Sequence, residues 1–359
     1  MKVKKIIFPV VLFIAGLVFF ILNNKNDISA LPLVFAIGLF AIGLVLLIKG
    51  GDWFVDGASS IAEKFKIPEI IIGATIVSIG TTLPEVMVSA QAAFKGNGAI
   101  SYGNAIGSII CNVSLIAAIT LAVKPAKAER KSMIVPVLFF FIAAGFYSFT
   151  AYVTGKFSRM TGIVLLCMFA TYMIITVITA VSNKKKTPEQ AEKADDDKES
   201  MPMLQAVLFL VLGAAIIAFG ATLLVDNGTI IATKIGVPSS VIALTFVALG
   251  TSLPELVTAI TSLAKGHGSL SLGNSIGANL FNLVLVSGLS VVIRPFDVPA
   301  EKMFLNTGLN ASLIVDIPLM ILVMLILTVP ALVKGKLYRW QGILLLMIYA
   351  GFCVFQFAF

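Results

Sequence analysis

Charged residues are scarce in this chain. Only 12% of its 359 residues are Asp, Glu, Lys or Arg, whereas 58% are hydrophobic, and the mean hydropathy is +1.03. A soluble fold of this length could not cover so much apolar surface. The net charge of +8 therefore does not point to nucleic acid. The composition predicts an all-α polytopic membrane protein whose surroundings are a lipid bilayer.

Histidine and cysteine are almost absent as well. The single histidine, His267, lies in a short turn between glycines, where we expect a solvated loop residue, and this removes histidine-based metal or nucleophilic chemistry. Cys111, Cys167 and Cys353 fall in apolar runs without metal-ligand spacing, which predicts small core residues. The sequence also lacks a His-Glu-x-x-His motif, and its long apolar runs contain no serine–lysine pair at helical spacing. These absences argue against an enzyme and against a bound cofactor.

Apolar runs long enough to span a membrane recur along the whole chain. Crossing about 30 Å of hydrocarbon takes roughly 20 helical residues. Eleven such spans are predicted, near residues 6–22, 31–50, 70–93, 99–122, 133–153, 160–182, 203–225, 240–263, 270–293, 314–333 and 340–358. Most Lys and Arg residues then fall on one side, which predicts a cytoplasmic N-terminus and an extracellular or periplasmic C-terminus. Without a large soluble domain or an evident protein partner, we expect a compact protein of the cell membrane.

The segment 1–30 has two interpretations. Its basic start, followed by an apolar run and Ile28-Ser29-Ala30, resembles a signal sequence with a cleavage site. The apolar run is long for a signal sequence, which favours an extra N-terminal membrane helix. Both interpretations leave residue 31 outside, so the topology of the remaining spans is the same.

The chain contains an internal repeat. The stretch 73–112 aligns without a gap with 243–282, and 16 of the 40 positions are identical. The offset of 170 also relates Asp56 to Asp226, acids that we expect to be interfacial or capping. Each copy holds five spans, an odd number, so the second copy enters the membrane upside down, and such inverted repeats place their substrate site near the midplane. The predicted division is 31–182 for the first repeat, 183–202 for a polar cytoplasmic linker and 203–359 for the second repeat.

One acidic residue lies deep inside each copy. Glu85 ends the sequence Gly-Thr-Thr-Leu-Pro-Glu and Glu255 ends Gly-Thr-Ser-Leu-Pro-Glu. A charged side chain at the bilayer centre costs about 2.5 to 3.5 kcal/mol on insertion scales, so it is normally retained for an ion, a proton or a partner. No Lys or Arg lies inside these helices to pair with the two glutamates. They are therefore predicted to form one site from two related halves.

The residues before each glutamate offer further oxygen atoms. Pro84 has no N–H, so the Gly80 carbonyl loses its helical partner and a break is predicted there. Freed carbonyls at a helix break suit cations. Hydroxyl and carboxyl groups share one helical face in the first copy, and the second copy repeats the spacing. The positions are Ser78, Thr81, Thr82 and Glu85 in the first copy, and Ala248, Thr251, Ser252 and Glu255 in the second.

The next span of each copy carries amides at four-residue intervals. The two stripes are Asn104, Ser108 and Asn112, and Asn274, Ala278 and Asn282. Amides in hydrocarbon must find partners. We expect Asn112 and Asn282 to bind a cation, and Asn104 and Asn274 to hold helices together.

The combined set contains oxygen but neither nitrogen nor sulfur ligands, which is the preference of hard cations. Calcium takes six to eight oxygen atoms at about 2.3–2.6 Å in a tolerant geometry. Two glutamates neutralise one divalent ion, and in its absence they could hold sodium ions or protons. This alternation is a physical basis for exchange.

The paired segments are similar to the two alpha-repeats of the cation/calcium antiporter superfamily, sodium/calcium exchanger type. The resemblance covers about residue 31 to the C-terminus. It implies two inverted five-helix repeats, ten core transmembrane helices that alternate access to one central site, with the N-terminal helix outside this core. Carried over by position, it implies side-chain ligands and two backbone carbonyl ligands. The side chains are Thr81, Thr82, Glu85, Ser108, Asn112, Thr251, Ser252 and Glu255, and the carbonyls are those of Ser78 and Ala248.

Three positions depart from the family pattern and leave the coupling ion open. Asn282 stands where some exchangers have aspartate, Ala278 lacks a serine hydroxyl, and Ile109 replaces an asparagine. Hydroxyls and carbonyls outnumber carboxylates, which favours Ca²⁺ export driven by Na⁺ entry. The alternative is exchange of Ca²⁺ or another divalent ion for H⁺, since two titratable acids remain for two protons. A cation channel is less expected, because an open pore would not need two mirror-related sites.

Overall fold

The computed structural model describes residues 33–65, 67–125, 129–186, 201–234, 251–300, 304 and 308–358. Within these ranges nine helical stretches are long and apolar enough to cross a membrane, and Leu253–Ala264 is a shorter apolar helix. Together they correspond to the ten predicted core spans. The predicted span 6–22, residues 187–200 of the predicted linker and Ala248 lie outside the described residues.

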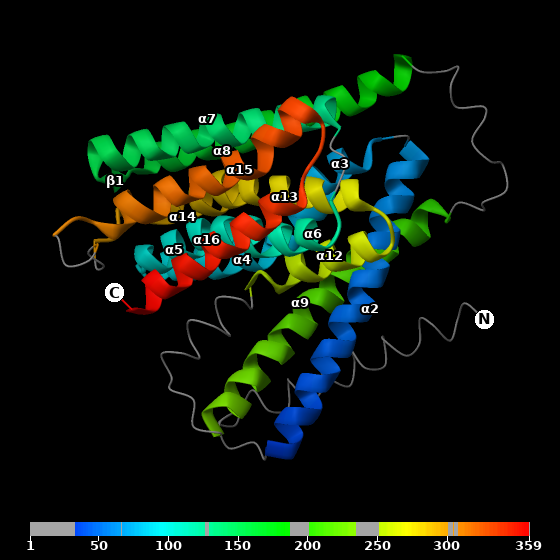
Figure 1. Cartoon of the computed structure of the whole chain (residues 1–359), viewed down its shortest axis with the longest axis horizontal. Coiled ribbons are helices and arrows are strands. Elements are labelled where there is room, and N and C mark those ends of the chain that lie inside the picture. The colour runs from blue at the N-terminus through cyan, green and yellow to red at the C-terminus, as the bar shows by residue number, and fades with distance from the viewer. Residues whose placement is uncertain are drawn as a thin grey trace.

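The membrane-spanning helices of the two halves follow in the same order, whereas β1 and β2 come at different points of the two halves (Figure 1). The first half contains α2 (Leu33–Phe65), α3 (Glu69–Ile72), the π-helical turn η2 (Gly73–Val77), α4 (Ser78–Phe94), α5 (Gly98–Cys111), η3 (Asn112–Ala117), α6 (Ala118–Val123), α7 (Arg130–Thr154), β1 (Lys156–Phe157) and α8 (Arg159–Lys186). The second half contains α9 (Met203–Lys234), α12 (Leu253–Ala264), α13 (Gly268–Phe281), η6 (Asn282–Val286), α14 (Ser287–Ile293), β2 (Phe296–Asp297), η8 (Ser312–Asp316), α15 (Ile317–Lys334) and α16 (Arg339–Ala358). The repeat is therefore present in the structure as well as in the sequence: α5 and α13 begin and end 170 residues apart.

The helices α2 and α9 pack closely along their length and run antiparallel. Gly57 lies against Ala206 and Leu210, whereas Gly220, further along α9, lies against Gly43, nearer the start of α2. Small residues allow helix backbones to approach each other in a membrane. Because α2 and α9 are corresponding helices of the two copies and point in opposite directions, the second repeat is inverted. In Figure 1 the pair projects from the rest of the bundle.

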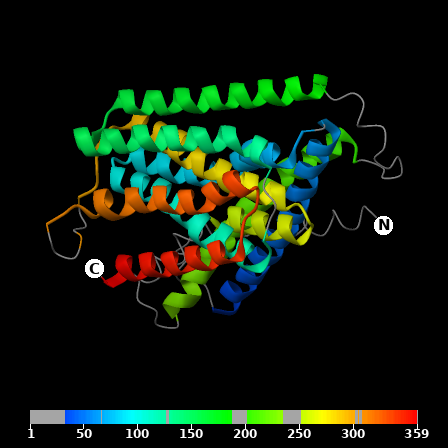
Figure 2. The same ribbon diagram turned by 45° about the horizontal axis from the view of Figure 1, so that its top comes forward.

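The other helices also exchange equivalent contacts between the halves. Gly162 of α8 lies against the Gly288 carbonyl in α14, and Gly342 of α16 lies against the Ala118 carbonyl in α6. Reciprocal contacts of this kind indicate that the two repeats are related by an approximate two-fold axis. Strands β1 and β2 add one antiparallel pairing between the halves, with Phe157 opposite Phe296. Figure 2 shows the long helices of the bundle lying side by side.

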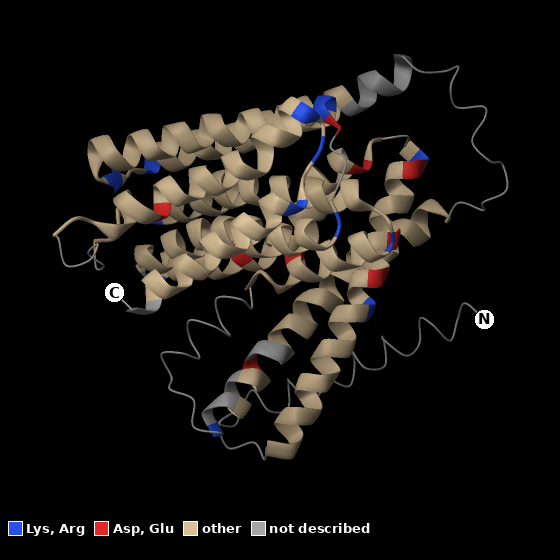
Figure 3. Ribbon diagram, in the orientation of Figure 1, with Lys and Arg blue, Asp and Glu red and all other residues tan. Residues whose placement is uncertain are grey.

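Apolar side chains cover the outside of the bundle as well as its core. Phe35, Met160 and Trp340 are each more than half exposed, which suits a hydrocarbon surrounding. Most Lys, Arg, Asp and Glu positions lie near the ends of helices (Figure 3). The chain is thus a multi-pass membrane protein. The prediction that all three cysteines are core residues is wrong for Cys167, which is on the outer face of α8 and exposed.

The predicted break at Gly80 and Pro84 is wrong for the first half. Helix α4 continues through Pro84, and the irregularity lies earlier, in the π-helical turn η2. A proline removes a single hydrogen bond, and neighbouring helices can maintain the helix around it. In the second half α12 starts at Leu253 with Pro254 in its first turn, a position where proline is tolerated.

Candidate functional site

Glu85 and Glu255 come together in the interior of the bundle. Their exposed fractions are 0% and 2%, and the charge of Glu255 acts on Glu85. Glu85 lies in α4 of the first half and Glu255 in the first turn of α12 of the second. Two buried carboxylates that repel each other are unfavourable unless a cation or protons neutralise them. The sequence had predicted this convergence from the repeat.

A set of buried polar atoms around the two glutamates has no hydrogen-bond partner in the described part of the chain. It includes both carboxylate oxygens of each glutamate and the amide oxygen and nitrogen of two asparagines, together with two hydroxyls. Buried polar atoms in folded proteins nearly always have a partner. Such a cluster therefore fits a site whose oxygen atoms bind a cation. The residues are Glu85, Glu255, Asn112, Asn282, Thr82 and Ser252.

Both asparagines begin a π-helical turn. Asn112 is the first residue of η3 and Asn282 is the first residue of η6. Helix α4 lies against η6, and α12 lies against η3, so each glutamate helix meets the asparagine turn of the other half. A π-helical turn inserts one extra residue per turn and often occurs at functional sites. These turns could not be predicted from the sequence, because the apolar pattern is the same on either side of them.

Two hydroxyl groups of α4 are hydrogen-bonded across the halves. The Thr81 hydroxyl donates to the side-chain oxygen of Asn274 at 3.2 Å, and Thr81 also lies beside Glu255. The Ser78 hydroxyl lies 2.7 Å from the Gly73 carbonyl and 3.2 Å from the same Asn274 oxygen. Both residues are buried at the site, whereas a ligand role for the Ser78 carbonyl stays a prediction.

The remaining predicted ligands lie on the same helices. Ser108 is buried in α5 one turn before Asn112, and Thr251 is half-buried next to Ser252 at the start of α12. The prediction that Asn104 holds helices together is supported by its contacts. Its amide donates to the Glu85 carbonyl at 3.1 Å and to the Ser89 hydroxyl at 2.8 Å.

Acidic side chains are few at this site. Among the described residues no group of three or more His, Cys, Asp or Glu side chains could hold a metal ion. A cation between Glu85 and Glu255 would therefore depend on neutral hydroxyl and amide oxygens for the rest of its shell. Neutral ligands bind less tightly than carboxylates, which suits an ion that must be released.

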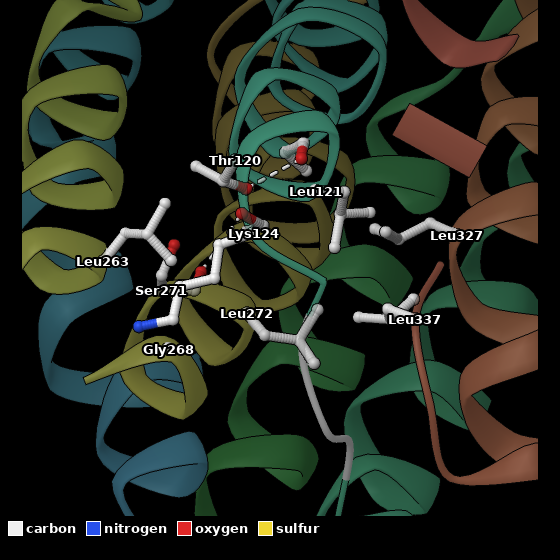
Figure 4. A pocket seen from close by; sticks show the side chains of 11 residues that line it. Thr120, Leu121, Lys124, Leu263, Gly268, Ser271, Leu272, Leu327 and Leu337 are labelled. Atoms are coloured by element: carbon white, nitrogen blue, oxygen red, sulfur yellow. Dashed lines mark hydrogen bonds between the residues drawn. The ribbon is translucent and has the colours of Figure 1, made fainter. Parts of the chain in front are cut away.

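A pocket reaches the site from the side of the α2–α9 pair. It lies where this pair meets α4 and α12. Its lining includes Phe54, Thr81, Pro84, Ala214 and Pro254. A second pocket, shown in Figure 4, is separate from the site and contains none of the predicted ligands; Thr120, Lys124, Leu263, Ser271 and Leu337 are part of its lining.

Charged side chains join the turn between α12 and α13 to the first half. The Lys265 ammonium lies 2.7 Å from the Asp56 carboxylate and 2.9 Å from the Asp52 carbonyl. His267 Nδ1 lies 2.6 Å from the Glu69 carboxylate. His267 lies in the predicted turn and is half-buried, but the prediction of a solvated residue did not include this contact with Glu69. The sequence could not show this contact, because the partner is 198 residues away.

The family described as sodium/calcium exchanger protein matches the chain twice, over residues 35–178 and 205–358. The sodium/calcium exchanger MaX1 of Methanosarcina acetivorans is 33% identical over 351 residues, covering 89% of this chain and 97% of the relative. The putative antiporter CaxA of Alkalimonas amylolytica is 36% identical and covers 87% and 95%. A solved structure of the sodium-calcium exchanger NCX_Mj, with 31% sequence identity, superposes with a TM-score of 0.71 and covers 89% of this chain and 97% of its own.

Proposed function

The chain belongs to the sodium/calcium exchanger family, and we propose that it exchanges Na⁺ for Ca²⁺ at the site where α4 and α12 meet. The observation that carries this proposal is the buried cluster of oxygen atoms without hydrogen-bond partners in the described part of the chain. A transporter needs no cofactor for this reaction, because the ions are its substrates. The free energy for Ca²⁺ transport comes from the Na⁺ gradient.

We propose that Ca²⁺ binds between Glu85 and Glu255, where two negative charges balance one divalent ion. Neutral oxygens complete the shell, and Na⁺ ions occupy overlapping positions when Ca²⁺ leaves. The side-chain ligands are Thr81, Thr82, Glu85, Ser108, Asn112, Thr251, Ser252, Glu255 and Asn282, and the carbonyl ligands are those of Ser78 and Ala248. The burial of Glu85, Thr82, Asn112 and Asn282 supports this set.

Movement of the α2–α9 pair against the remaining helices would give the two sides alternating access. The pair is held together by close backbone contacts, such as Gly57 with Ala206, so it can move as one body. The pocket lined by Phe54 and Thr81 lies on the boundary that such a movement would change. Alternating access at a fixed central site is the general behaviour of inverted repeats.

We propose that the protein lies in the cell membrane with a cytoplasmic N-terminus and an outer C-terminus, and that it exports Ca²⁺ as Na⁺ enters. The transported cations, Ca²⁺ and Na⁺, are the only binding partners that this activity requires. The proposed units are residues 1–30 as a separate N-terminal segment, 31–182 and 203–359 as the two repeats, and 183–202 as a cytoplasmic linker. The asymmetric distribution of Lys and Arg supports this orientation.

Ion flux in reconstituted liposomes tests the exchange. Liposomes loaded with Na⁺ should take up ⁴⁵Ca²⁺ when diluted into Na⁺-free medium, and the uptake should saturate with Ca²⁺. Liposomes loaded with K⁺, and protein-free liposomes, are the controls. Uptake driven by a pH gradient without Na⁺ would replace this proposal by exchange of Ca²⁺ for H⁺. Uptake that needs no counter-ion and does not saturate would instead indicate a channel.

A further inference from the structure

We infer that Asn274 is a positioning residue for cation binding, because its side-chain oxygen directs the proton of the Thr81 hydroxyl away from the site. The inference deepens the proposed function and rests on it. Asn274 belongs to α13 of the second half and is 2% exposed, and Thr81 belongs to α4 of the first half and is 1% exposed. The contact therefore crosses from one repeat to the other inside the bundle.

The orientation of the Thr81 hydroxyl decides whether its oxygen can bind a cation. A hydroxyl has one proton and two lone pairs. One acceptor within reach of the Thr81 hydroxyl is Asn274 Oδ1 at 3.2 Å. Glu255, beside Thr81, is the competing acceptor. When the Thr81 hydroxyl donates its proton to Asn274, both lone pairs of the Thr81 oxygen remain available to bind a cation. The oxygen atoms of the Glu255 carboxylate then also remain available.

The same asparagine oxygen is less important for Ser78. The Ser78 hydroxyl has a closer acceptor, the Gly73 carbonyl at 2.7 Å, against 3.2 Å to Asn274. The effect of Asn274 therefore passes through Thr81. Asn104, which corresponds to Asn274 in the first repeat, differs because it donates its amide to the Glu85 carbonyl and so supports the backbone.

Replacing Asn274 by leucine removes the acceptor but keeps the number of side-chain heavy atoms and their branching at Cγ. We expect the Ca²⁺ and Na⁺ concentrations for half-maximal transport to rise about tenfold, which corresponds to about 1.4 kcal/mol, while the maximal rate changes little. Asn274→Asp keeps an acceptor oxygen and should restore most of the Ca²⁺ affinity. In a Thr81→Val background, Asn274→Leu should have no further effect, because the two residues act together.

A purely structural role would give a different pattern. In the Asn274→Leu variant, the fraction of folded protein and the maximal rate would fall. The effects of Thr81→Val and Asn274→Leu would be additive, and Asn274→Asp would not restore the Ca²⁺ affinity. That pattern, or an unchanged half-maximal concentration in folded Asn274→Leu protein, overturns the inference. If the leucine variant does not fold, Asn274→Ala in the two backgrounds gives the same comparison. Wild-type protein without Na⁺-dependent Ca²⁺ uptake would contradict the proposed function itself.

A second inference rests on separate contacts, the ion pairs between Lys265 and α2. We infer that the Lys265–Asp56 pair stabilises one of the two facing states of the protein, and that Lys95 and Asp226 form the counterpart in the other state. The offset of 170 that relates Lys95 to Lys265 also relates Asp56 to Asp226. Lys95 is exposed and Asp226 is half-buried, and neither makes an ion pair with another described residue.

Inverted symmetry supplies the reason for this pairing. When the two halves exchange conformations, a contact from the second half to α2 becomes the equivalent contact from the first half to α9. The bond between Lys265 and Asp56 is then replaced by a bond between Lys95 and Asp226. The two ion pairs exclude each other, so each stabilises one of the two states of the transporter.

The matched variants Asp56→Asn and Asp226→Asn test this inference. A partly exposed ion pair is worth up to about 1 kcal/mol, so each variant should shift the ratio of half-maximal Ca²⁺ concentrations on the two sides of oriented vesicles by up to about fivefold. The shifts should be in opposite directions, and the double variant should return toward wild type. Asp297→Asn, an exposed carboxylate in β2, is the control. Shifts in the same direction, or no shift with Asp226→Asn, overturn the inference.

Discussion

Glu85→Gln protein should lose at least 99% of its Na⁺-dependent Ca²⁺ uptake while it remains folded in the membrane. The amide keeps the volume of the side chain but removes one of the two charges that face the cation. A divalent ion would then be buried with one unbalanced positive charge, and an uncompensated buried charge costs about 3 to 5 kcal/mol. Each 1.4 kcal/mol is a tenfold change in affinity, so a loss of more than a hundredfold is expected.

Glu255→Gln should give a loss of the same size, because Glu85 and Glu255 are equivalent in the two repeats and equally buried. Glu63→Gln, which changes an exposed glutamate of α2, is the matched control and should transport normally. Uptake of ⁴⁵Ca²⁺ is measured per folded transporter, with monodispersity in detergent as the test of folding. Near wild-type uptake by either site variant would show that the cation does not bind between these two carboxylates.

Gly57→Ala should reduce the thermal stability of the protein in detergent. A Cβ atom at this position would lie 2.6 Å from the Ala206 carbonyl and 2.6 Å from the Leu210 nitrogen, both backbone atoms of α9. Overpacking of this kind costs about 1 to 3 kcal/mol. With an unfolding entropy of roughly 2.1 cal/mol/K per residue, each kcal/mol lowers the unfolding temperature of a 359-residue chain by roughly 1.3 °C. A fall of roughly 1 to 4 °C is therefore expected.

Gly38→Ala is the control within the same helix. Gly38 is exposed, and a Cβ atom there would have no described neighbour within 4 Å. Alanine favours a helix over glycine by up to about 1 kcal/mol, so this variant should be unchanged or slightly more stable. Equal unfolding temperatures for the two variants would mean that α2 and α9 are not held together by this backbone contact.

Prediction from the sequence succeeded where one residue carries a large free energy. A glutamate inside an apolar span is so costly that a shared buried site for the two acids could be expected without a structure, and its recurrence after 170 residues located the repeat. The inverted orientation followed from an odd number of spans. It is visible in the antiparallel packing of Gly57 and Gly220 of the two halves against each other's helices.

The sequence failed where the free energies are small or the partners are distant. The π-helical turns at Asn112 and Asn282 change the register by one residue and leave the apolar pattern unaltered. The contact of Thr81 with Asn274 spans 193 residues, and no local pattern can predict it. The break expected at Pro84 did not occur because packing maintains the helix around one missing hydrogen bond.

The buried carboxylates of Glu85 and Glu255 would affect how tightly the carrier couples Na⁺ flux to Ca²⁺ flux. An empty carrier that changed its facing side would have to bring both bare charges through a closed intermediate of low polarity. Burying the unpaired charges in that step costs several kcal/mol per ion. The empty carrier should therefore rarely change its facing side. The cost of burying unpaired charges thus opposes Na⁺ entry that is not coupled to Ca²⁺ transport. The Na⁺ gradient should therefore dissipate slowly when no Ca²⁺ is transported.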